Sequence, residues 1–562
     1  MKVLIIGGVA GGATAAARLR RLDEKAEIVI LERSGYVSYA NCGLPYFIGG
    51  EITERESLTL QTPESFFNRF RIDVRTRQEA LHIHRAEKKV TVRDLNTGRE
   101  YEETYDKLIL SPGAKPLIPD IPGVSLDRVF TLRTVEDTFK IHDFVTQNNI
   151  RSAAVIGGGF IGLEMAENLK QRRLSVTLLQ RSQHVMPPFD MNMAVMAHNQ
   201  MRANGIVLKT NTNVTGIKET QGVLQVLLQE DTPVSADMVI LAVGVLPENT
   251  LAKEAGLSLG IKGAIQTNDK MQTEDPHIYA VGDAVEVKHF VSGRQAVISL
   301  AGPANKQGRI AADQICGIDH RFTGSQGSSV LKLFDMTLAA TGLNERDAAA
   351  AGLNFDYVIL GSPSHATYYP GAANMTIKVL FEKKTGKILG GQIIGFGGVD
   401  KRIDVLAAAI RAGMTAYDLT QLDLAYAPPY SSAKDPINMA GFVIENLIEG
   451  NAEQIHWEAL NSLPENAFLL DVRTQEEYSM GYLADSHHIP VDELRERISE
   501  LPTDQPLYIF CQSGLRSYLA CRILKQEGYT CFNIAGGYGF YEQSLQNAAP
   551  RPEGTGPCGL KS

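Results

Sequence analysis

The sequence is poor in cysteine, with six among 562 residues. They stand at positions 42, 316, 511, 521, 531 and 558. They are too few and too scattered for a disulfide framework, and none has the CxxC spacing of a metal site. No run approaches the roughly 18 consecutive apolar residues of a membrane-spanning helix. These absences predict a cytoplasmic protein, in a reducing compartment and with no membrane partner.

The sequence also lacks an excess of positive charge. Lysine and arginine number 55 against 64 aspartate and glutamate residues, for a formal net charge of −9. This balance argues against a general nucleic-acid or anionic-membrane binder, so an acidic ligand needs a local basic patch. At roughly 150 residues per domain, the chain has room for about four folding units.

A glycine-rich turn follows the first apolar run. Residues 3–6 lead into GGVAGG at 7–12, a helical stretch and a second apolar run ending at Glu32. A parallel βαβ unit uses such a turn to present backbone N–H groups to a pyrophosphate, and an acid about 20 residues later to bind a ribose. Val9 replaces the middle glycine of GxGxxG, which leaves an ordinary strand-to-helix turn as the alternative. The candidate cofactor residues here are Gly7, Val9, Ala10, Gly11, Glu32 and Arg33.

A second turn matches the full GxGxxG spacing. Gly157, Gly159 and Gly162 follow a short apolar strand, and the next strand ends at Gln180 and Arg181. An acid at that end selects an unphosphorylated ribose and an arginine accepts a 2′-phosphate. Gln180 and Arg181 therefore leave the choice between NADH and NADPH open.

Three further motifs accompany the two turns. They are LILSPGAKP at 108–116, MVILAVGVLPENT at 238–250 and IYAVGDA at 278–284. With these motifs, residues 1 to 445 resemble the two-dinucleotide flavoprotein disulfide reductases. The resemblance implies FAD at the first turn, NAD(P)H at the second, Asp283 on the flavin ribityl chain and Phe160 as an aromatic cover of the flavin. Packing is the alternative role of Phe160. The resemblance also implies cofactor contacts from Asn41, Ser111, Gly113 and Ala301.

Cys42 is the one cysteine in SYANCGLPYFIGG at 38–50, where typical disulfide reductases carry a CxxxxC pair. A single thiol can form a mixed disulfide, a persulfide or a sulfenic acid, and we expect a helix N-terminus and the flavin to lower its pKa. The pattern resembles the single-cysteine subgroup of coenzyme A disulfide reductases, NADH oxidases and NADH peroxidases. The oxidases and peroxidases generally carry a histidine on the first helix, and this helix has none.

The first helix instead offers a basic face. Thr14, Arg18, Arg20 and Arg21 lie along it, and arginines can hold the phosphates of coenzyme A. An ordinary solvated helix face is the alternative interpretation. The substrate-binding residues predicted for coenzyme A are Thr14, Arg18, Arg21, Ser38, Asn41 and Lys434.

Two tyrosine-rich segments point the same way. HATYYPGAANM at 365–375 and DLAYAPPYSSAKDPINMAG at 423–441 resemble the C-terminal dimerisation domain of coenzyme A disulfide reductases. The resemblance implies a homodimer in which Tyr368 and Tyr426 reach the thiol site of the partner subunit, with Lys434 near the coenzyme A phosphates. Simple packing of the dimer interface is the alternative role of the tyrosines.

The last part of the chain carries a further motif and a cysteine loop. AFLLDVRTQEEYSMGYLADSHHIPVDELRERI at 467–498 carries Asp471, Arg473 and Glu477, and the loop at 511–516 begins with Cys511 and ends with Arg516. These segments resemble a rhodanese. A cysteine between a strand and a helix start has backbone N–H groups directed at its sulfur, which stabilise a thiolate or persulfide. Cys511 and Arg516 are therefore candidate catalytic residues. We expect Cys521 and Cys531 to pack rather than react, leave the role of Cys558 open, and predict no metal site at His487 and His488.

These motifs predict an α/β protein with two Rossmann-like domains, an α+β dimerisation domain and a C-terminal α/β rhodanese domain. The predicted regions are FAD-binding 1–149 and 245–325, NAD(P)H-binding 150–244, dimerisation 326–445, linker 446–458, rhodanese 459–548 and flexible tail 549–562.

The predicted enzyme is an NAD(P)H-dependent flavoprotein. It reduces persulfides, polysulfides or coenzyme A disulfide at Cys42 and carries an appended sulfurtransferase domain. Coenzyme A enters as a substrate or a tightly bound group. The alternatives are a plain coenzyme A disulfide reductase, a sulfur-binding redox sensor and an NADH oxidase.

Overall fold

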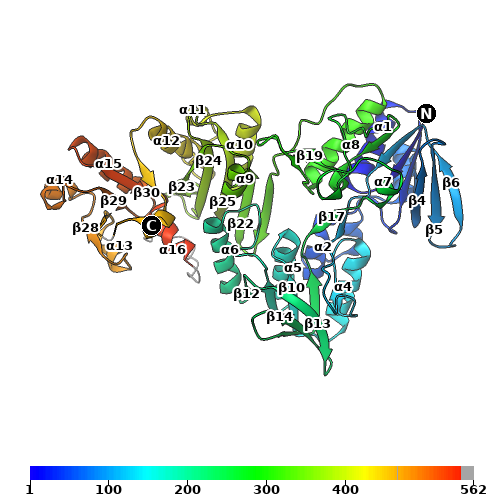
Figure 1. Cartoon of the computed structure of the whole chain (residues 1–562), viewed down its shortest axis with the longest axis horizontal. Coiled ribbons are helices and arrows are strands. Elements are labelled where there is room, and N and C mark those ends of the chain that lie inside the picture. Colours follow the sequence, from blue (N-terminus) through cyan, green and yellow to red (C-terminus); the bar gives the residue numbers. More distant parts are fainter. Residues whose placement is uncertain (465, 546–562) are drawn as a thin grey trace. The chain divides into compact units, whose positions relative to one another are not determined.

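The computed structural model describes residues 1–464 and 466–545, and its elements are labelled in Figure 1. The chain divides into two compact units. The first comprises residues 1–185 and 205–327, and the second comprises residues 186–204 and the chain from 328 onward.

A parallel five-stranded sheet, in the order β18-β7-β1-β2-β3, organises the first half of the first unit. Its strands are β1 (Lys2–Ile6), β2 (Glu27–Glu32), β3 (Asp73–Thr76), β7 (Lys107–Leu110) and β18 (Ile278–Ala280). The predicted strand at residues 3–6 is thus the centre of this sheet. An antiparallel sheet of β4 (Gln78–His84), β5 (Lys89–Asp94) and β6 (Glu100–Thr104) adjoins it in sequence.

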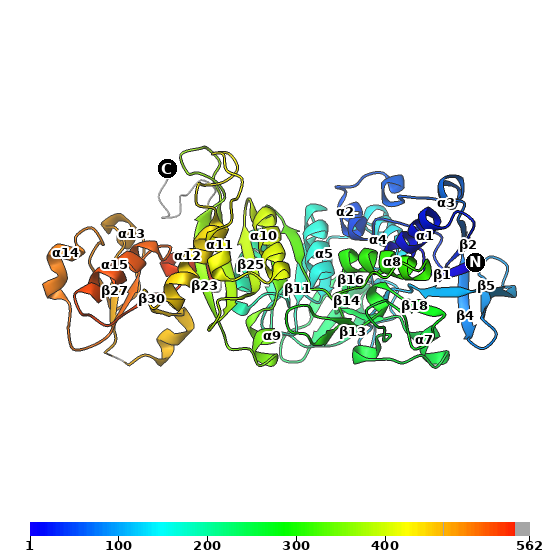
Figure 2. The same ribbon diagram turned by 90° about the horizontal axis from the view of Figure 1, so that it is seen from above.

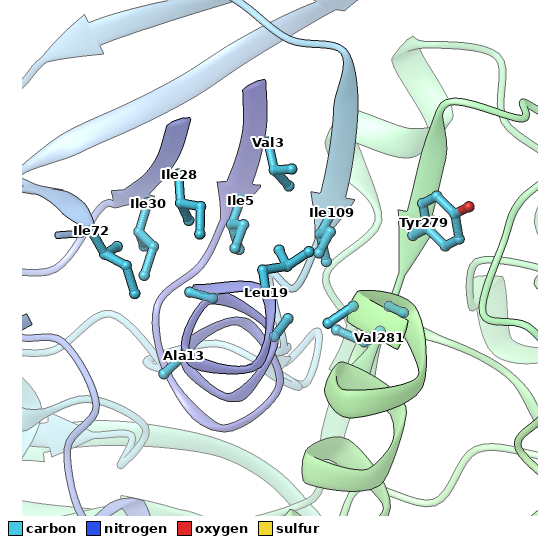
Figure 3. Close-up of a cluster of buried hydrophobic side chains, with 14 of the residues drawn as sticks. Val3, Ile5, Ala13, Leu19, Ile28, Ile30, Ile72, Ile109, Tyr279 and Val281 are labelled. Atoms are coloured by element: carbon cyan, nitrogen blue, oxygen red, sulfur yellow. The ribbon is translucent and has the colours of Figure 1, made fainter. Parts of the chain in front are cut away.

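Helix α1 (Ala10–Leu22) packs against α8 (Ala301–Ile315), and the two lie side by side in Figure 2. Their backbones approach closely, since a Cβ on Gly308 of α8 would lie 2.2 Å from the carbonyl oxygen of Gly11. Figure 3 shows the core beneath them, where Val3 and Ile5 of β1 meet Leu19 of α1. Every second residue of β1 and β2 fills this core, and the residues between them fill another core on the opposite face, because both faces of the parallel sheet are buried.

A second parallel sheet, in the order β12-β11-β10-β16-β9, lies in the same unit. Its strands are β9 (Val129–Phe130), β10 (Ser152–Ile156), β11 (Ser175–Leu179), β12 (Val207–Lys209) and β16 (Met238–Leu241). The smaller strands are β8 (Ala114–Pro116), β13 (Val214–Thr220), β14 (Val223–Leu228), β15 (Val234–Ala236), β17 (Val245–Pro247), β19 (Val287–Lys288) and β20 (Gln295–Ala296). The other helices of this unit are α2 (Leu44–Gly49), α3 (Pro63–Phe70), α4 (Val135–Gln147), α5 (Phe160–Gln171) and α7 (Thr250–Glu254).

The second unit begins with an antiparallel sheet in the order β21-β22-β25-β24-β23. Its strands are β21 (Ser329–Leu333), β22 (Met336–Gly342), β23 (Phe355–Pro363), β24 (Asn374–Glu382) and β25 (Ile388–Gly395). Helices α10 (Val399–Ala412), α11 (Ala416–Thr420) and α12 (Pro436–Ile448) lie next to one another over this sheet (Figures 1 and 2), and α9 (Glu345–Ala350) joins β22 to β23.

Helix α6 (Met191–Ala203) also packs on this sheet, although the sequence-based division places residues 186–204 in the NAD(P)H-binding region. Buried polar contacts account for this position. The Gln392 amide donates to Asp190 at 2.6 Å and accepts the Asp190 backbone N–H at 2.9 Å, and the buried Lys378 lies 2.9 Å from the same carboxylate.

The last sheet, in the order β26-β30-β29-β27-β28, is parallel throughout. Its strands are β26 (Gln454–Ile455), β27 (Phe468–Asp471), β28 (Ser486–His488), β29 (Leu507–Phe510) and β30 (Cys531–Ile534). Its helices are α13 (Gln475–Ser479), α14 (Leu494–Arg497), α15 (Leu515–Gln526) and α16 (Gly537–Ser544). The stretch predicted as a linker, 446–458, therefore contains the end of α12 and the edge strand β26. Within the described residues, no helix is long and apolar enough to cross a membrane.

Candidate active sites

The first glycine turn is built for close approach. Gly7 has a φ of +94°, and a Cβ there would lie 2.1 Å from the carbonyl oxygen of Ser111. A Cβ on Gly12 would lie 1.9 Å from the Gly7 carbonyl oxygen. Among the described residues, no side chain caps the start of α1, and its first turn carries no acid. The chain therefore leaves the N-terminal end of α1 open to a pyrophosphate, which fits a dinucleotide.

Glu32 stands at the end of β2 and is tied to this turn. Its carboxylate accepts the backbone N–H of Gly8 at 2.8 Å and that of Ser34 at 2.9 Å. Burial raises the pKa of Glu32, while the two N–H groups act to lower it. Arg33, next along the chain, is exposed and lies 3.6 Å from Glu79.

Two other predicted cofactor residues, Gly113 and Asp283, meet around Arg133, which the sequence did not single out. The Arg133 guanidinium lies 3.0 Å from the Asp283 carboxylate, and a Cβ on Gly113 would lie 2.9 Å from the same guanidinium. A Cβ on Gly11 would lie 3.0 Å from the Ser111 hydroxyl. Ala301 begins α8 and is exposed. Gln307 of the same helix accepts the Gly282 N–H at 2.7 Å and so fixes the turn before Asp283.

The second glycine turn repeats the first with different side chains. A Cβ on Gly162 would lie 1.9 Å from the Gly157 carbonyl oxygen, whereas one on Gly159 would meet nothing within 4 Å. The Gln180 side chain accepts the Gly158 N–H at 2.8 Å, as Glu32 accepts that of Gly8. Phe160 is half-buried at the start of α5, and Arg181 is exposed.

Cys42 lies in a single 3₁₀ turn, Asn41–Gly43, directly before α2, and both Asn41 and Cys42 are exposed. Ser38 sits in the left-handed region, with a φ of +47°, and its backbone N–H donates to the Gly8 carbonyl oxygen at 2.8 Å. The thiol-bearing segment is thereby fastened to the first glycine turn.

The chain's own groups raise the pKa of the Cys42 thiol. Partial desolvation is the main cause, and the carboxylates of Glu164 and Asp283 add to it, while Arg133 acts in the opposite direction. The lowered pKa expected from the sequence rested on a helix N-terminus and the bound flavin together, and it stays a prediction for the FAD-loaded protein. Desolvation also raises the pKa of Glu164, on α5, to about 7, and the Tyr46 hydroxyl donates to that carboxylate at 3.5 Å.

The predicted basic face of α1 is largely engaged inside the protein. Arg18 pairs at 2.6 Å with Asp313, a fully buried carboxylate on α8. Arg20 is buried, and Thr14 donates to Asn305. Of these predicted substrate contacts on α1, Arg21 is the exposed one.

The two tyrosine-rich segments come together in the second unit. The hydroxyls of Tyr368 and Tyr426 lie 2.8 Å apart, and the side chains are 74% and 46% exposed. Lys434 is exposed, next to the buried Asp435. The two tyrosines are far apart in the sequence, so the contact between their hydroxyls could not be predicted from local patterns.

Cys511 is fully buried at the junction of β29 and its loop. The Gly514 N–H donates to the Cys511 sulfur at 3.1 Å, and the Ser517 hydroxyl lies 3.4 Å from it. Ser517 was not predicted, although it lies one residue beyond the predicted loop. These donors suit a thiolate or persulfide.

Arg516 does not simply supply a positive charge to the sulfur, as the sequence predicted. Its guanidinium binds both carboxylate oxygens of the buried Glu477, at 2.6 and 2.8 Å. Arg473 is also buried and pairs with Asp471.

The remaining cysteines lie apart from this donor set. Cys521 and Cys531 are buried in the same core, and the Cys531 thiol lies 3.4 Å from the Cys521 carbonyl oxygen. Cys558 and the predicted tail lie outside the described residues. In the part of the chain that the structure describes, no group of three or more His, Cys, Asp or Glu residues is placed to hold a metal ion.

Three family models match the chain. They are the pyridine nucleotide-disulphide oxidoreductase model at residues 1–308, the dimerisation domain of the same family at 328–436, and the rhodanese-like domain at 456–543. The coenzyme A disulfide reductase of Staphylococcus haemolyticus is 38% identical over 449 residues, which cover 79% of this chain and all of the relative.

Two solved structures resemble nearly the whole chain. The reduced CoADR-RHD of Bacillus anthracis has a TM-score of 0.95 and 47% identity, covering 97% of this chain and 98% of that one. The NAD-dependent persulfide reductase of A. fulgidus has a TM-score of 0.91 and 39% identity, covering 96% and 100%. The chain therefore belongs to the pyridine nucleotide-disulphide oxidoreductases, as a fusion of the coenzyme A disulfide reductase type with a C-terminal rhodanese domain.

Proposed function

We propose that this oxidoreductase uses NAD(P)H to reduce persulfides and polysulfides, coenzyme A persulfide among them, and coenzyme A disulfide. It releases hydrogen sulfide or a thiol. The observation that carries the proposal is the presence of two unlike sulfur sites in one chain, the exposed Cys42 and the buried, hydrogen-bonded Cys511. The similarity to a coenzyme A disulfide reductase and to a persulfide reductase supports it.

The proposed FAD site is centred on the first glycine turn. We assign the pyrophosphate to Gly7, Val9, Ala10 and Gly11, and the ribose to Glu32. Further contacts are assigned to Arg33, Asn41, Ser111, Gly113, Asp283 and Ala301. Phe160 would cover the ring, and the fixed carboxylate of Asp283 beside Arg133 suits a polyol chain. When bound, FAD supplies the two electrons of NAD(P)H to a disulfide or persulfide bond at Cys42.

The residues that would hold NAD(P)H are Gly157, Gly159, Gly162, Gln180 and Arg181. The amide of Gln180 occupies the place of a ribose-binding acid without its charge, and the exposed Arg181 follows it. A neutral amide beside an arginine accepts a ribose with or without a 2′-phosphate. We therefore propose that both nucleotides are used.

Cys42 carries the sulfur chemistry in this proposal. Its thiolate attacks the inner sulfur of R–S–SH, the S–S bond breaks, and Cys42–S–S–R and HS⁻ result. Attack on coenzyme A disulfide gives the Cys42–coenzyme A mixed disulfide and one coenzyme A thiolate. The thiolate with the lower pKa departs faster. Glu164, with a pKa of about 7, holds or releases a proton in the range where such thiols ionise.

The tyrosine pair serves the thiol site of the partner subunit. The two hydroxyls lie 2.8 Å apart, so one phenol can donate its hydrogen bond to the other. The second phenol then keeps its own O–H free to donate to a leaving thiolate. A homodimer is required for this role. Thr14, Arg21, Ser38, Asn41 and Lys434 are proposed contacts for coenzyme A, and Arg18 contributes through its ion pair with Asp313.

The rhodanese domain is proposed to load sulfane sulfur onto Cys511: the thiolate attacks the outer sulfur of a donor such as thiosulfate, the donor's S–S bond breaks and sulfite leaves. A Cys511 persulfide keeps the hydrogen bonds from Gly514 and Ser517, while Arg516 holds Glu477 at the edge of the loop. The persulfide then passes its outer sulfur to a small thiol such as coenzyme A, which regenerates the Cys511 thiolate and forms the substrate of Cys42.

The test is anaerobic hydrogen sulfide release from coenzyme A persulfide with NADH or NADPH. Cys42→Ser is expected to abolish release. Cys511→Ser is expected to keep it and to lose sulfur transfer from thiosulfate. Cys316→Ser, a half-buried cysteine at the end of α8, is the matched control.

The same assay separates the alternatives. A higher kcat/KM for coenzyme A disulfide than for the persulfide and polysulfide would show a plain disulfide reductase. Absence of turnover with every sulfur substrate, with the flavin still bleached by NAD(P)H, would show a redox sensor. Efficient oxygen consumption without any sulfur substrate would show an oxidase.

A further inference from the structure

Arg402 is a buried cation beneath the tyrosine pair. It lies in the first turns of α10, its side chain is 1% exposed, and no motif in the sequence marked it. One guanidinium nitrogen, Nη2, lies within hydrogen-bond distance of four oxygens on two separate segments. A charged group buried this deeply is held only where its hydrogen bonds and its charge are matched.

The four acceptors belong to the two tyrosine-bearing segments. They are the carbonyl oxygen of Ser364 at 2.9 Å, that of Tyr430 at 3.3 Å, the Ser431 hydroxyl at 3.1 Å and the Asp435 carboxylate at 3.1 Å. The first lies four residues before Tyr368, and the second lies four residues after Tyr426.

Backbone hydrogen bonds connect the residues that Arg402 holds to the two tyrosine-bearing loops. The Ser364 N–H donates to the Ala373 carbonyl oxygen at 2.7 Å and closes the loop that holds Tyr368. The Ala366 N–H donates to the Ser431 carbonyl oxygen at 3.0 Å and joins the two segments directly. The Ser431 hydroxyl, itself fully buried, donates to Asp435 at 2.7 Å.

The phenols need such support because they are exposed. A single hydrogen bond between two solvated side chains competes with water, and ordering both side chains opposes it. The 2.8 Å contact between the Tyr368 and Tyr426 hydroxyls therefore requires that the two backbone segments are already held in place.

We propose that Arg402 is a positioning residue, which holds the segments 364–373 and 426–435 together so that the Tyr368 and Tyr426 hydroxyls act as one pair. This inference rests on the proposed function, in which that pair serves the thiol site of the partner. Arg402 touches neither the substrate nor the reacting sulfur and acts through the tyrosines.

A double-mutant cycle in the FAD-loaded full-length dimer tests the proposal. Arg402→Lys keeps the charge opposite Asp435 but carries its nitrogen on a flexible stem, whereas the rigid guanidinium holds Nη2 against both segments while Nη1 lies 3.3 Å from the Gly398 carbonyl oxygen. We expect kcat/KM for coenzyme A disulfide to fall by roughly tenfold to a hundredfold, as for a misplaced reacting group. In the Tyr368→Phe/Tyr426→Phe background, the same substitution is expected to change kcat/KM less than about twofold.

Two further variants keep the test decisive if Arg402→Lys fails to fold. Ser431→Ala removes one acceptor and leaves the Arg402–Asp435 ion pair, and we expect a smaller loss that also disappears without the tyrosines. Asp404→Asn changes an exposed charge on the same helix, α10, and is the matched control, with no expected loss. Flavin reduction by NAD(P)H is expected to proceed at the same rate in all variants.

The outcomes separate the two proposals. Full activity of the tyrosine double variant would overturn the role of the pair and the role of Arg402 with it. A slow double variant in which Arg402→Lys costs as much as it does in the wild type would overturn the positioning role alone. Ultraviolet titration of the phenols gives a second readout, since the hydrogen bond between the two hydroxyls raises the pKa of Tyr368 and a loosened pair loses this shift.

Discussion

The Cys42 thiol sits among charges of both signs. Glu164 and Asp283 oppose its ionisation, and Arg133 favours it. These three groups come from distant parts of the chain, so the local sequence around Cys42 could not reveal them. The sequence predicted a low pKa from a helix N-terminus and the flavin together, whereas burial first, and then the two carboxylates, raise the pKa in the protein's own surroundings.

Glu164→Gln is expected to make the flavin-free protein more reactive at Cys42. A raised thiol pKa keeps the group protonated near neutral pH, and removing one carboxylate lets the thiolate form at lower pH. The rate of alkylation by iodoacetamide at pH 8 should rise by roughly threefold or more. Asp73→Asn, on the edge strand β3, is the control. An unchanged pH profile in Glu164→Gln would contradict the assigned cause.

Ser517→Ala tests the donors at Cys511. The Ser517 hydroxyl lies 3.4 Å from the sulfur, and the N–H of Gly514 is the other donor. We expect sulfur transfer from thiosulfate to cyanide to fall by roughly threefold to thirtyfold, since one of two donors is lost. Reduction of coenzyme A disulfide at Cys42 should be unchanged in the same preparation. Equal loss of both activities would indicate a folding defect instead.

At the scale of elements, α1 is fastened at its C-terminal end by Arg20. The buried guanidinium donates to the carbonyl oxygens of Phe70 at 2.7 Å, Arg71 at 2.9 Å and Glu24 at 2.7 Å. The segment after α3 is thereby tied to the end of α1, next to the core shown in Figure 3.

Arg20→Met is therefore expected to lower the free energy of unfolding of the first unit by about 2 to 4 kcal/mol, because a buried side chain loses its hydrogen bonds to several partly buried carbonyl oxygens together. Urea unfolding followed by flavin release measures the change. Arg21→Met, at the exposed neighbour, should stay within about 0.5 kcal/mol of the wild type. A similar effect of both substitutions would remove this role from Arg20.

Local sequence patterns predicted the helices and strands well. They did not predict ion pairs between residues that are far apart in the sequence. The apolar run before GGVAGG is the central strand β1, and Cys511 follows the strand β29, because strand periodicity and glycine turns are local properties. Arg18 illustrates the other case. Its partner Asp313 lies on α8, in a segment that carries no recognisable motif. The arginine that the sequence predicted as a coenzyme A contact therefore forms an internal ion pair. The pairing of Tyr368 with Tyr426 likewise depends on Arg402, which has no sequence signal.

At the scale of the whole molecule, each of the two units holds its own sulfur site. Within the second unit, the stretch predicted as a linker is bound to the antiparallel sheet. The Gln454 amide donates to the Tyr357 carbonyl oxygen at 2.8 Å, and His456 lies 3.0 Å from Asp356. The His456 and Tyr357 rings stack with centroids 3.7 Å apart. These contacts argue against a freely swinging rhodanese domain and favour a small thiol as the sulfur carrier.

Asp356→Ala is expected to expose this linker. Burial acts to raise the pKa of Asp356, but hydrogen bonds from His456 and from the Tyr357 N–H bring it below its ordinary value. A carboxyl with a lowered pKa stabilises the fold above its unfolded pKa, and this contribution is lost as the pH falls through the folded pKa. The folded pKa lies below 3.8, so cleavage by endoproteinase Glu-C at Glu449 and Glu453 should be slow in the wild type at both pH 8 and pH 4. In Asp356→Ala it should be roughly tenfold faster at both pH values. Lys383→Met, which removes an exposed cation 3.8 Å from Asp356, is the control. Equal cleavage of Asp356→Ala and wild type at pH 8 would show that the joint is held by the strand pairing of β26 alone.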